Sequence, residues 1–436
     1  MPAASSASSK RTDAREVALQ VARDVFGGPR RSARESLDYR ARRADLDPRD
    51  RAFAMELAYG SIKMRRLLDW YLEPYVGARA KTLPPAIAEV LRLGAYQLRV
   101  MGGVEKHAAV FESVGLARKF GHRGTAGLVN AVLRRVAEDE REPKPDDFAD
   151  RNEYLSVRYS LPTWIVRHWE ERFGADRLEQ IVDGVNQPAL ISLRVDLGRL
   201  SRQAALERLF AVGVAAHPSS LASDVVNLER GAPDGFIERF DDWTLQSESA
   251  AIAVDVLDPQ PGEHIIELCS GRGNKTLAIA TRMHDRGRVE AIEIDARKIE
   301  PARRMLAEAG IHCVEVIEGD ATQSRSNMAD AILVDAPCSA LGILGRQPEA
   351  RWRKSPEDPA RLAEAQRAML TAAVSSLGPG ARLVYSVCTT DRRECEDVVD
   401  AVLGSDAQLR RAHPDLLTAP GIERRDGFFV ALLERP

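Results

Sequence analysis

The sequence predicts a multidomain protein: an all-α N-terminal domain, a small α+β middle segment and a C-terminal α/β domain with a doubly wound parallel sheet. Two observations predict this fold class. Apolar residues recur at spacings of three and four from Asp13 to about Glu140, which is typical of helices. From about residue 241 onward, five short apolar runs alternate with helical stretches instead. A chain of 436 residues also exceeds the size of one ordinary core.

The helical domain is expected over residues 13–142, after a flexible tail at 1–12. Breaks in the helical pattern fall at GGPRR, DPRD and LPP. Residues 143–150, PKPDDFAD, are proline-rich and acidic and are expected to form a linker. The α+β segment at 151–240 then combines helices such as LPTWIVRHWEERF with the alternating run ISLRVD, a helix from Ser201 and the strand-like VVNLER.

The last domain, at 241–436, contains five predicted strands: HIIELCS, RVEAIEID, CVEVIEGD, AILVDAP and ARLVYSVC. Helical connections between them predict a parallel sheet covered on both faces. Ligands of such sheets bind outside the carboxyl ends of the strands. The polar clusters of this domain all follow those ends.

Charge and cysteine content narrow the environment and the partner. Residues 1–140 carry 25 Lys and Arg against 17 Asp and Glu, whereas the remainder carries 37 against 48. The basic front end favours an anionic partner, although an arginine-rich solvated surface explains the charge equally well. We expect a cytoplasmic protein without membrane contact, because no apolar run reaches the length of a membrane span and the first residues lack a signal peptide's apolar core. Five cysteines without a C-x-x-C pair, and no histidine cluster, predict free thiols and no metal.

The stretch IIELCSGRGNKT is typical of a strand, a glycine turn and a helix. Ser270, Gly271 and Gly273 are small enough for a ligand to approach the backbone and the helix N-terminus. Thr276 stands where a dinucleotide fingerprint has its third glycine, and Asn274 stands where a P-loop has the glycine before its lysine. The turn therefore indicates a different nucleoside ligand.

Acids at the next strand ends indicate the charge of that ligand. Glu293 and Asp295 lie about 20 residues after the glycine turn, at the position where an acid can accept hydrogen bonds from ribose hydroxyls. Glu293 is better placed than Asp295 if its strand stops after Ile292. Asp320 ends the following strand. Together they favour a neutral or cationic nucleoside such as S-adenosylmethionine over a polyphosphate. Helix N-capping accounts for any one of these acids better than for all three.

Two cysteines follow the last two predicted strands. Cys338 lies in DAPCSALG, after AILV, and Cys388 lies in SVCTT. Either one alone is best interpreted as a small buried residue. Beside Asp335 and a nucleoside site, the two together favour chemistry.

These motifs resemble the RNA cytosine-C5 methyltransferases, specifically the bacterial 16S ribosomal RNA branch called RsmB, Sun or Fmu. DAPCSALG is similar to its DAPCSATG, and VYSVCTT to its YATCS. The segments DRAFAMELAYG, LRLGAYQL, KHAAVFESVGLARK and GLVNAVLRR resemble its NusB-type helical domain. LQSESA and the GFF of RDGFF match as well, so the resemblance covers nearly the whole chain.

The resemblance implies methyl transfer from S-adenosylmethionine to C5 of a cytosine, through addition of a thiolate to C6. By the family pattern Cys388 is the nucleophile, Cys338 assists release of the product and Asp335 bonds the base edge. In DNA cytosine methyltransferases the cysteine after a proline attacks instead, so the sequence leaves an exchange of roles between Cys338 and Cys388 open.

The resemblance also implies a Rossmann-like cofactor site, consisting of Cys269, Ser270, Gly271, Arg272, Gly273, Asn274, Lys275, Glu293, Asp320 and Asp335. The family usually reads CAAPGGKT where this chain reads CSGRGNKT. Asn274 is expected to adopt the left-handed conformation of the glycine it replaces, and Arg272 adds a charge. Glu293 replaces the more usual aspartate.

The expected partner is ribosomal RNA, 16S by resemblance, in an unassembled or partly assembled small subunit and bound by a monomer. The expected RNA contacts are Arg346, Lys275 and Trp352, two of them in the basic segment GRQPEARWRK. Trp352 is interpreted either as a stacking platform for a base or as half-buried packing. Two other functions remain open: a transfer RNA cytosine-C5 methyltransferase, and a non-catalytic RNA-binding protein with a degenerate cofactor site.

Overall fold

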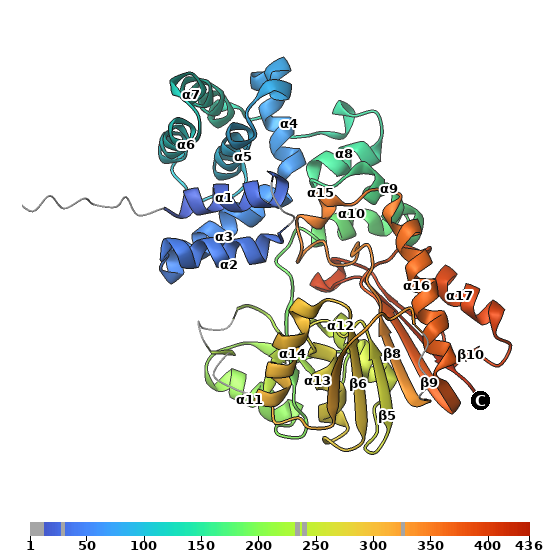
Figure 1. The fold of residues 1–436 in the computed structure, drawn as a ribbon. Coiled ribbons are helices and arrows are strands. Elements are labelled where there is room, and N and C mark those ends of the chain that lie inside the picture. The colour runs from blue at the N-terminus through green and yellow to red at the C-terminus, as the bar shows by residue number, and fades with distance from the viewer. Residues whose placement is uncertain (1–12, 28–30, 232–235, 238–241, 324–327) are drawn as a thin grey trace, which may run out of the picture. The chain divides into compact units, whose positions relative to one another are not determined.

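The computed structural model describes residues 13–27, 31–231, 236–237, 242–323 and 328–436 (Figure 1). The chain forms two compact units. The helical unit comprises Met1–Arg167 with Gln347–Arg353, and the sheet unit comprises His168–Arg346 with Lys354–Pro436. The tail expected at residues 1–12 lies outside the described residues. Within those ranges, no helix combines the length and the apolar character needed to cross a membrane.

The helical unit confirms the predicted all-α domain. Its elements are α1 (Ala14–Gly27), α2 (Ala33–Ala44), α3 (Pro48–Lys63), α4 (Arg65–Val76), η1 (Gly77–Thr82), α5 (Pro85–Arg99), α6 (Lys106–Phe120), α7 (Arg123–Glu138), η2 (Pro145–Asp147), α8 (Arg151–Arg158) and α15 (Ala350–Arg353). Local signals start several of them. The Ser32 hydroxyl accepts the Glu35 N–H at 3.1 Å, and the Glu35 carboxylate accepts the Ser32 N–H, which forms a capping box at α2.

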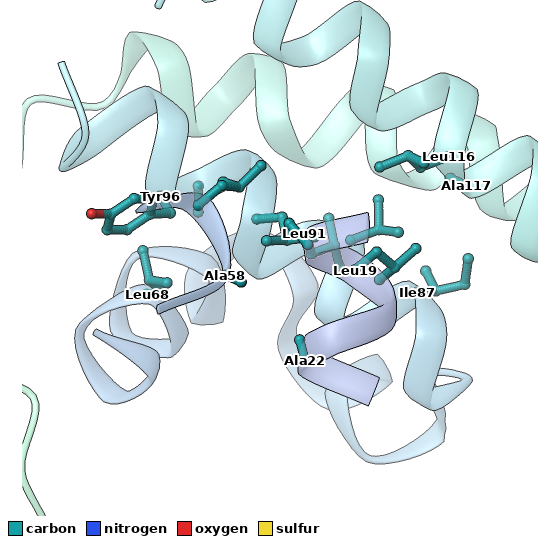
Figure 2. Packing of buried hydrophobic residues seen from close by; sticks show 14 of the residues in the cluster. Leu19, Ala22, Ala58, Leu68, Ile87, Leu91, Tyr96, Leu116 and Ala117 are labelled. Atoms are coloured by element: carbon teal, nitrogen blue, oxygen red, sulfur yellow. The ribbon is translucent and has the colours of Figure 1, made fainter. Parts of the chain in front are cut away.

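One buried cluster joins these helices. Figure 2 shows Leu19 of α1, Ala58 of α3, Leu91 of α5 and Leu116 of α6 among its members. The glycine of LAYG allows α3 and α5 to approach closely, because a Cβ at Gly60 would lie 2.0 Å from the Tyr96 ring. The apolar periodicity of the sequence therefore becomes a shared core.

The helical unit extends beyond the predicted boundary at residue 142. Val157 of α8 packs against Leu67 and Tyr71 of α4, and Phe148 from the expected linker packs on the same cluster. Segment 143–150 also contains η2. Composition indicated a linker there, but these apolar contacts hold the segment and α8 in the unit.

The middle of the chain forms a small antiparallel sheet, as the α+β prediction requires. Its helices are α9 (Thr163–Phe173), α10 (Ala175–Gly184) and α11 (Arg202–Ala211), and its strands are β1 (Ile191–Val195), β2 (Ala216–Pro218), β3 (Val225–Leu228) and β4 (Trp243–Leu245). The strand order is β2-β3-β1-β4. All three pairings are antiparallel.

The larger sheet has eight strands in the order β10-β12-β9-β8-β5-β6-β7, with β11 paired to β12. The five predicted strands are present and parallel: β5 (His264–Leu268), β6 (Arg288–Glu293), β7 (Val314–Glu318), β8 (Ala329–Asp335) and β9 (Leu377–Val387). Three further strands were not predicted from the sequence: β10 (Arg410–Arg411), β11 (Leu416–Thr418) and β12 (Phe428–Glu434). Strand β12 runs antiparallel to β9. The sheet is therefore mixed.

Helices cover both faces of this sheet, as predicted (Figure 1). Ile266 and Ile332 face a core that includes α16 (Asp358–Ser375) and α17 (Glu396–Ser405). Their neighbours Ile265 and Leu333 face the opposite core with α12 (Glu248–Leu257) and α13 (Asn274–Arg282). Helix α14 (Ala296–Glu308) packs near β6 and β7. The chain reverses its direction of winding between β5 and β8, which is the usual ligand position in such sheets.

Candidate active site

The two cysteines meet at the carboxyl ends of β8 and β9. These strands are parallel neighbours, with Asp335 opposite Ser386 in register. Cys338 lies three residues after the end of β8, and Cys388 directly follows β9. Their Sγ atoms are 3.1 Å apart, and both side chains are partly exposed. The structure thus brings together the thiols that the sequence placed on separate strands.

The two thiols interact directly, and either sulfur can donate to the other. The hydrogen bond to Cys388, together with burial, raises the pKa of Cys338 well above its ordinary value. Cys338 is therefore a thiol that keeps its proton and can donate it across the 3.1 Å separation. A thiolate is the nucleophilic form of cysteine, so a pair of thiols that shares a proton can present one nucleophilic sulfur beside Asp335.

Backbone contacts hold the cysteine loops together. The Gly342 N–H donates to the Cys388 carbonyl at 3.1 Å, and the Gly427 N–H donates to the Gly342 carbonyl at 2.7 Å. A Cβ at Gly342 would lie 1.8 Å from the Gly427 carbonyl oxygen. Gly342 of DAPCSALG and Gly427 of RDGFF thus contact each other closely.

Asp335 lies beside the thiols in a charged group. Its Oδ2 accepts from Lys275 Nζ at 2.6 Å, and its Oδ1 accepts from the Ser386 hydroxyl at 2.9 Å. Burial lowers the pKa of Lys275, but the charges of Asp335 and Glu267 outweigh burial and raise it overall. The Asp335 side chain is 29% exposed, so a ligand can still reach it. Lys275 is thus a charged link between the glycine turn and the cysteine side.

Main-chain conformation shapes the glycine turn. Cys269, Gly271 and Gly273 have positive φ angles of 62°, 63° and 85°. Burial raises the pKa of Cys269 to about 12, so this thiol is not a nucleophile. Arg272 and Asn274 are both exposed. Their side chains are therefore accessible to solvent.

The expected left-handed conformation of Asn274 is wrong. Gly273 takes that conformation, and Asn274 is the first residue of α13. A Cβ at Gly273 would lie 3.0 Å from the Met305 methyl group. The chain therefore retains glycine where space is limited and carries asparagine where it is not.

The turn fits a nucleoside cofactor. Ser270 is 8% exposed, and no atom in the described ranges bonds its hydroxyl oxygen, which is unusual for a buried polar group. No described side chain caps α13, so its first N–H groups are available to a ligand. A Cβ at Gly271 would meet only the Cys269 carbonyl within 4 Å, at 3.9 Å. Space and donors therefore coincide at this turn.

The strand-end acids separate into different roles. Glu293 is buried and accepts the N–H groups of Gly271 at 2.8 Å and Asp295 at 2.9 Å. Asp295 caps α14 through the Arg297 N–H, as the N-cap interpretation expects. Asp320 accepts the backbone N–H and the hydroxyl of Thr322, which lower its pKa. Glu293 thus stabilises the turn. The ribose contacts expected of Glu293 and Asp320 stay predictions.

The proposed RNA contacts of the segment 345–354 have protein partners. Arg346 Nε donates to Asp426 at 2.8 Å, and Arg346 Nη2 donates to the Leu190 carbonyl at 2.7 Å. Trp352 is half-buried against the core of the helical unit and donates from Nε1 to the Ile62 carbonyl at 2.6 Å. These contacts agree with the half-buried packing interpretation of Trp352, and its stacking on a base stays a prediction. The charged residues on either side of Trp352 in the sequence gave no indication of this tertiary contact.

Glu267 was missed by the sequence analysis. It is a buried acid in β5, it accepts from the Thr276 hydroxyl, and burial raises its pKa to about 8. Its position in the apolar run HIIEL was the available signal, because a charged residue in a buried strand needs a partner.

Comparison with known proteins identifies the family. The family described as 16S rRNA methyltransferase RsmB/F matches residues 254–434. The NusB family matches residues 12–138, and the ferredoxin-like domain of RsmF/B-like methyltransferases matches 161–233. The ribosomal RNA small subunit methyltransferase B of Thermus thermophilus is 33% identical, over 97% of both chains. The chain belongs to the RsmB family.

A second relative agrees with this membership, and a solved structure shares the fold. A probable ribosomal RNA small subunit methyltransferase B from Synechocystis is 30% identical, over 97% of this chain and 99% of the relative. The crystal structure of PH0851 has a TM-score of 0.80 at 22% identity, over 97% of this chain and 98% of that one. The three-part order of an RsmB protein, with NusB, ferredoxin-like and methyltransferase parts, is therefore shared along the chain.

Proposed function

We propose that this RsmB-family protein methylates C5 of a cytosine in 16S ribosomal RNA through a covalent bond between Cys388 and C6 of the base. The observation that carries the proposal is the pair of thiols 3.1 Å apart beside Asp335. Membership of the RsmB family and the printed names of its relatives support the class of substrate.

The chemistry explains why two thiols and an acid are needed. C5 of cytosine is a poor nucleophile, but addition of the Cys388 thiolate to C6 makes C5 an enamine carbon. Asp335 accepts a hydrogen bond from the base edge and favours the protonated, more electrophilic ring. After C5 gains its methyl group, a water molecule in the pocket accepts the C5 proton, its electron pair re-forms the C5–C6 double bond, and the S–C6 bond breaks. The proton held by Cys338 stabilises the departing Cys388 thiolate.

Residues of the turn would hold S-adenosylmethionine, whose sulfonium supplies the methyl group as an electrophile when the cofactor is bound. Ser270, Gly271 and the start of α13 offer the space and donors described above, and Glu293 and Asp320 are the acids proposed for the ribose and its surroundings. Lys275 connects this side to Asp335. Despite Arg272 and Asn274, the turn keeps its positive φ angles and its left-handed Gly273, which supports cofactor binding over a degenerate site.

The experiment uses purified protein, labelled S-adenosylmethionine, and ribosomal and transfer RNA from cells that lack this protein. We expect label in 16S RNA as 5-methylcytosine. Label in transfer RNA alone would assign the other substrate class, and no transfer to either RNA would favour the non-catalytic function.

Adduct formation on RNA containing 5-fluorocytosine distinguishes the two cysteines. This base traps the covalent intermediate, since its C5 fluorine cannot leave as a proton does. We expect an adduct with the wild type and with Cys338→Ala, and none with Cys388→Ala. An adduct retained by Cys388→Ala and lost by Cys338→Ala would establish the exchanged roles.

A further inference from the structure

A buried carboxylate links the two cysteine loops. Glu394 lies between β9 and α17 and is fully buried. Its Oε1 accepts the Ser339 N–H and Gln366 Nε2, each at 2.9 Å. Its Oε2 accepts the Ser339 hydroxyl and, at 3.2 Å, the Thr389 hydroxyl. A buried carboxylate is costly unless its oxygens are bonded, and here each oxygen has two donors.

The donors belong to both cysteine loops. Ser339 directly follows Cys338, and Thr389 directly follows Cys388. Their hydroxyl oxygens are also 2.8 Å apart. Gln366 adds a third connection, because its Nε2 donates to the Pro337 carbonyl at 2.9 Å, on the other side of Cys338. One carboxylate therefore reaches the residues that flank both thiols.

We propose that Glu394 is a positioning residue for the two-thiol site, holding the loops that carry Cys338 and Cys388 so that their sulfur atoms stay in contact. This inference builds on the proposed function, since it concerns the same two thiols. Glu394 acts through Ser339 and Thr389 rather than on the substrate. Its backbone carbonyl accepts from the Tyr385 hydroxyl at 2.7 Å, which anchors it to β9.

A glutamine at this position separates geometry from charge. Its amide oxygen can accept the Ser339 N–H, and its NH₂ group can donate to the Ser339 and Thr389 hydroxyls, which rotate to accept. Glu394→Gln should therefore preserve the link between the loops. Glu394→Ala removes all four hydrogen bonds and should allow the two loops to move apart.

The test measures sulfur geometry without RNA or cofactor. Diamide oxidises two neighbouring thiols to a disulfide: the thiols lose two protons and two electrons, and the N=N bond of diamide is reduced to a hydrazine. Peptide mass spectrometry then follows the Cys338–Cys388 disulfide in the full-length protein. We expect rapid formation in the wild type, a rate lowered at least about tenfold in Glu394→Ala, and a rate within about threefold of wild type in Glu394→Gln.

Glu248→Ala is the matched control. Glu248 is another buried carboxylate of the sheet unit, and it accepts from Ser219, Asn227 and Arg425 at 2.6 to 2.7 Å. None of its partners directly flanks Cys338 or Cys388, so the oxidation rate should stay near wild type. The proposal is overturned if Glu394→Ala oxidises at the wild-type rate, or if Glu248→Ala is slowed equally. If Glu394→Ala does not fold, Ser339→Ala and Thr389→Val carry the same test, and unchanged rates in both would overturn it.

Methyl transfer provides the second measurement. In Glu394→Ala we expect kcat to fall at least about tenfold while KM for S-adenosylmethionine stays within about threefold, with recovery in Glu394→Gln. A failure of the proposed function would appear as a wild type that forms the disulfide but transfers no methyl group. A failure of the positioning role would appear as an active enzyme whose Glu394→Ala variant keeps both its kcat and its oxidation rate.

Discussion

The glycine turn after β5 and the cysteine loops after β8 and β9 lie at the same edge of one sheet but are held differently. Main-chain conformation shapes the turn, through positive φ angles at Cys269, Gly271 and Gly273. Buried side chains shape the cysteine loops, through the bonds of Glu394 to Ser339 and Thr389. The same edge of the sheet therefore combines two kinds of structural constraint.

This difference predicts which departures from the family's motifs each region can accept. Arg272 and Asn274 differ from the usual turn sequence, and both are exposed. In the cysteine loops, a change at a buried polar residue would leave a partner unsatisfied. Substitutions should therefore be tolerated on the outside of the turn, whereas the buried polar residues of the loops should accept only replacements that keep the bonding group, as Thr389 does where the family has serine.

The largest expected effect is from Gly342→Ala in the cysteine loops. The added methyl group would overlap the Gly427 backbone, which no side-chain rotation can relieve. We expect the free energy of unfolding, from urea titration, to fall by more than about 4 kcal/mol. The control Gly404→Ala lies in helix α17 with open space around its Cβ, and should gain up to about 1 kcal/mol. A loss below about 1 kcal/mol in Gly342→Ala would show that the loops do not depend on the close contact between Gly342 and Gly427.

Next comes the buried acid beneath the turn. Burial raises the pKa of Glu267 to about 8, so the folded protein holds a proton that the unfolded chain releases at lower pH. The contribution of Glu267 to the free energy of unfolding is fully present below about pH 4.5 and is lost as the pH rises through about 8. Urea titrations across this window should show a decline of a few kcal/mol in the wild type. Glu267→Gln should flatten that decline, and an equal slope in the two proteins would contradict the assignment.

Lys275→Met tests the connection between the two regions. Removing the cation leaves Asp335 with only its Ser386 hydrogen bond among the interactions described for it, so the carboxylate loses its fixed position. We expect kcat for methyl transfer to fall about 100-fold, equivalent to about 2.7 kcal/mol of transition-state stabilisation. Lys298→Met is the comparison, because Lys298 is 42% exposed and lies 3.4 Å from Glu293. In Lys298→Met, kcat should stay within about threefold of wild type. Equal losses in the two variants would show that the Lys275–Asp335 pair does not position Asp335.

The smallest effects are expected within the turn itself. Gly273→Ala forces a side chain into a left-handed conformation near Met305, and should lower the free energy of unfolding by about 1–2 kcal/mol. Arg272→Ala, at an exposed position, should stay within about 0.5 kcal/mol. Thermal and urea unfolding measure both. If Arg272→Ala is the more damaging change, main-chain conformation is not what holds the turn.

Much of the fold could be predicted because its signals are local. The five apolar runs became the parallel strands β5 to β9, and helical periodicity gave the N-terminal domain. The antiparallel strands β10 to β12 were missed because no strand–helix alternation marks them. The linker expected at 143–150 instead packs Phe148 on α4, since composition does not show what an isolated aromatic residue contacts.

The sequence by itself determined the classes of element, the strand ends that carry polar residues and, by resemblance, the family. Only the tertiary structure placed Cys338 and Cys388 3.1 Å apart, gave Glu394 its partners in both loops and set Trp352 against a helical core. The reason is physical. Periodicity and turn chemistry act between residues near in sequence, whereas the distance between two thiols and the burial of a side chain depend on strands and helices that meet only after folding.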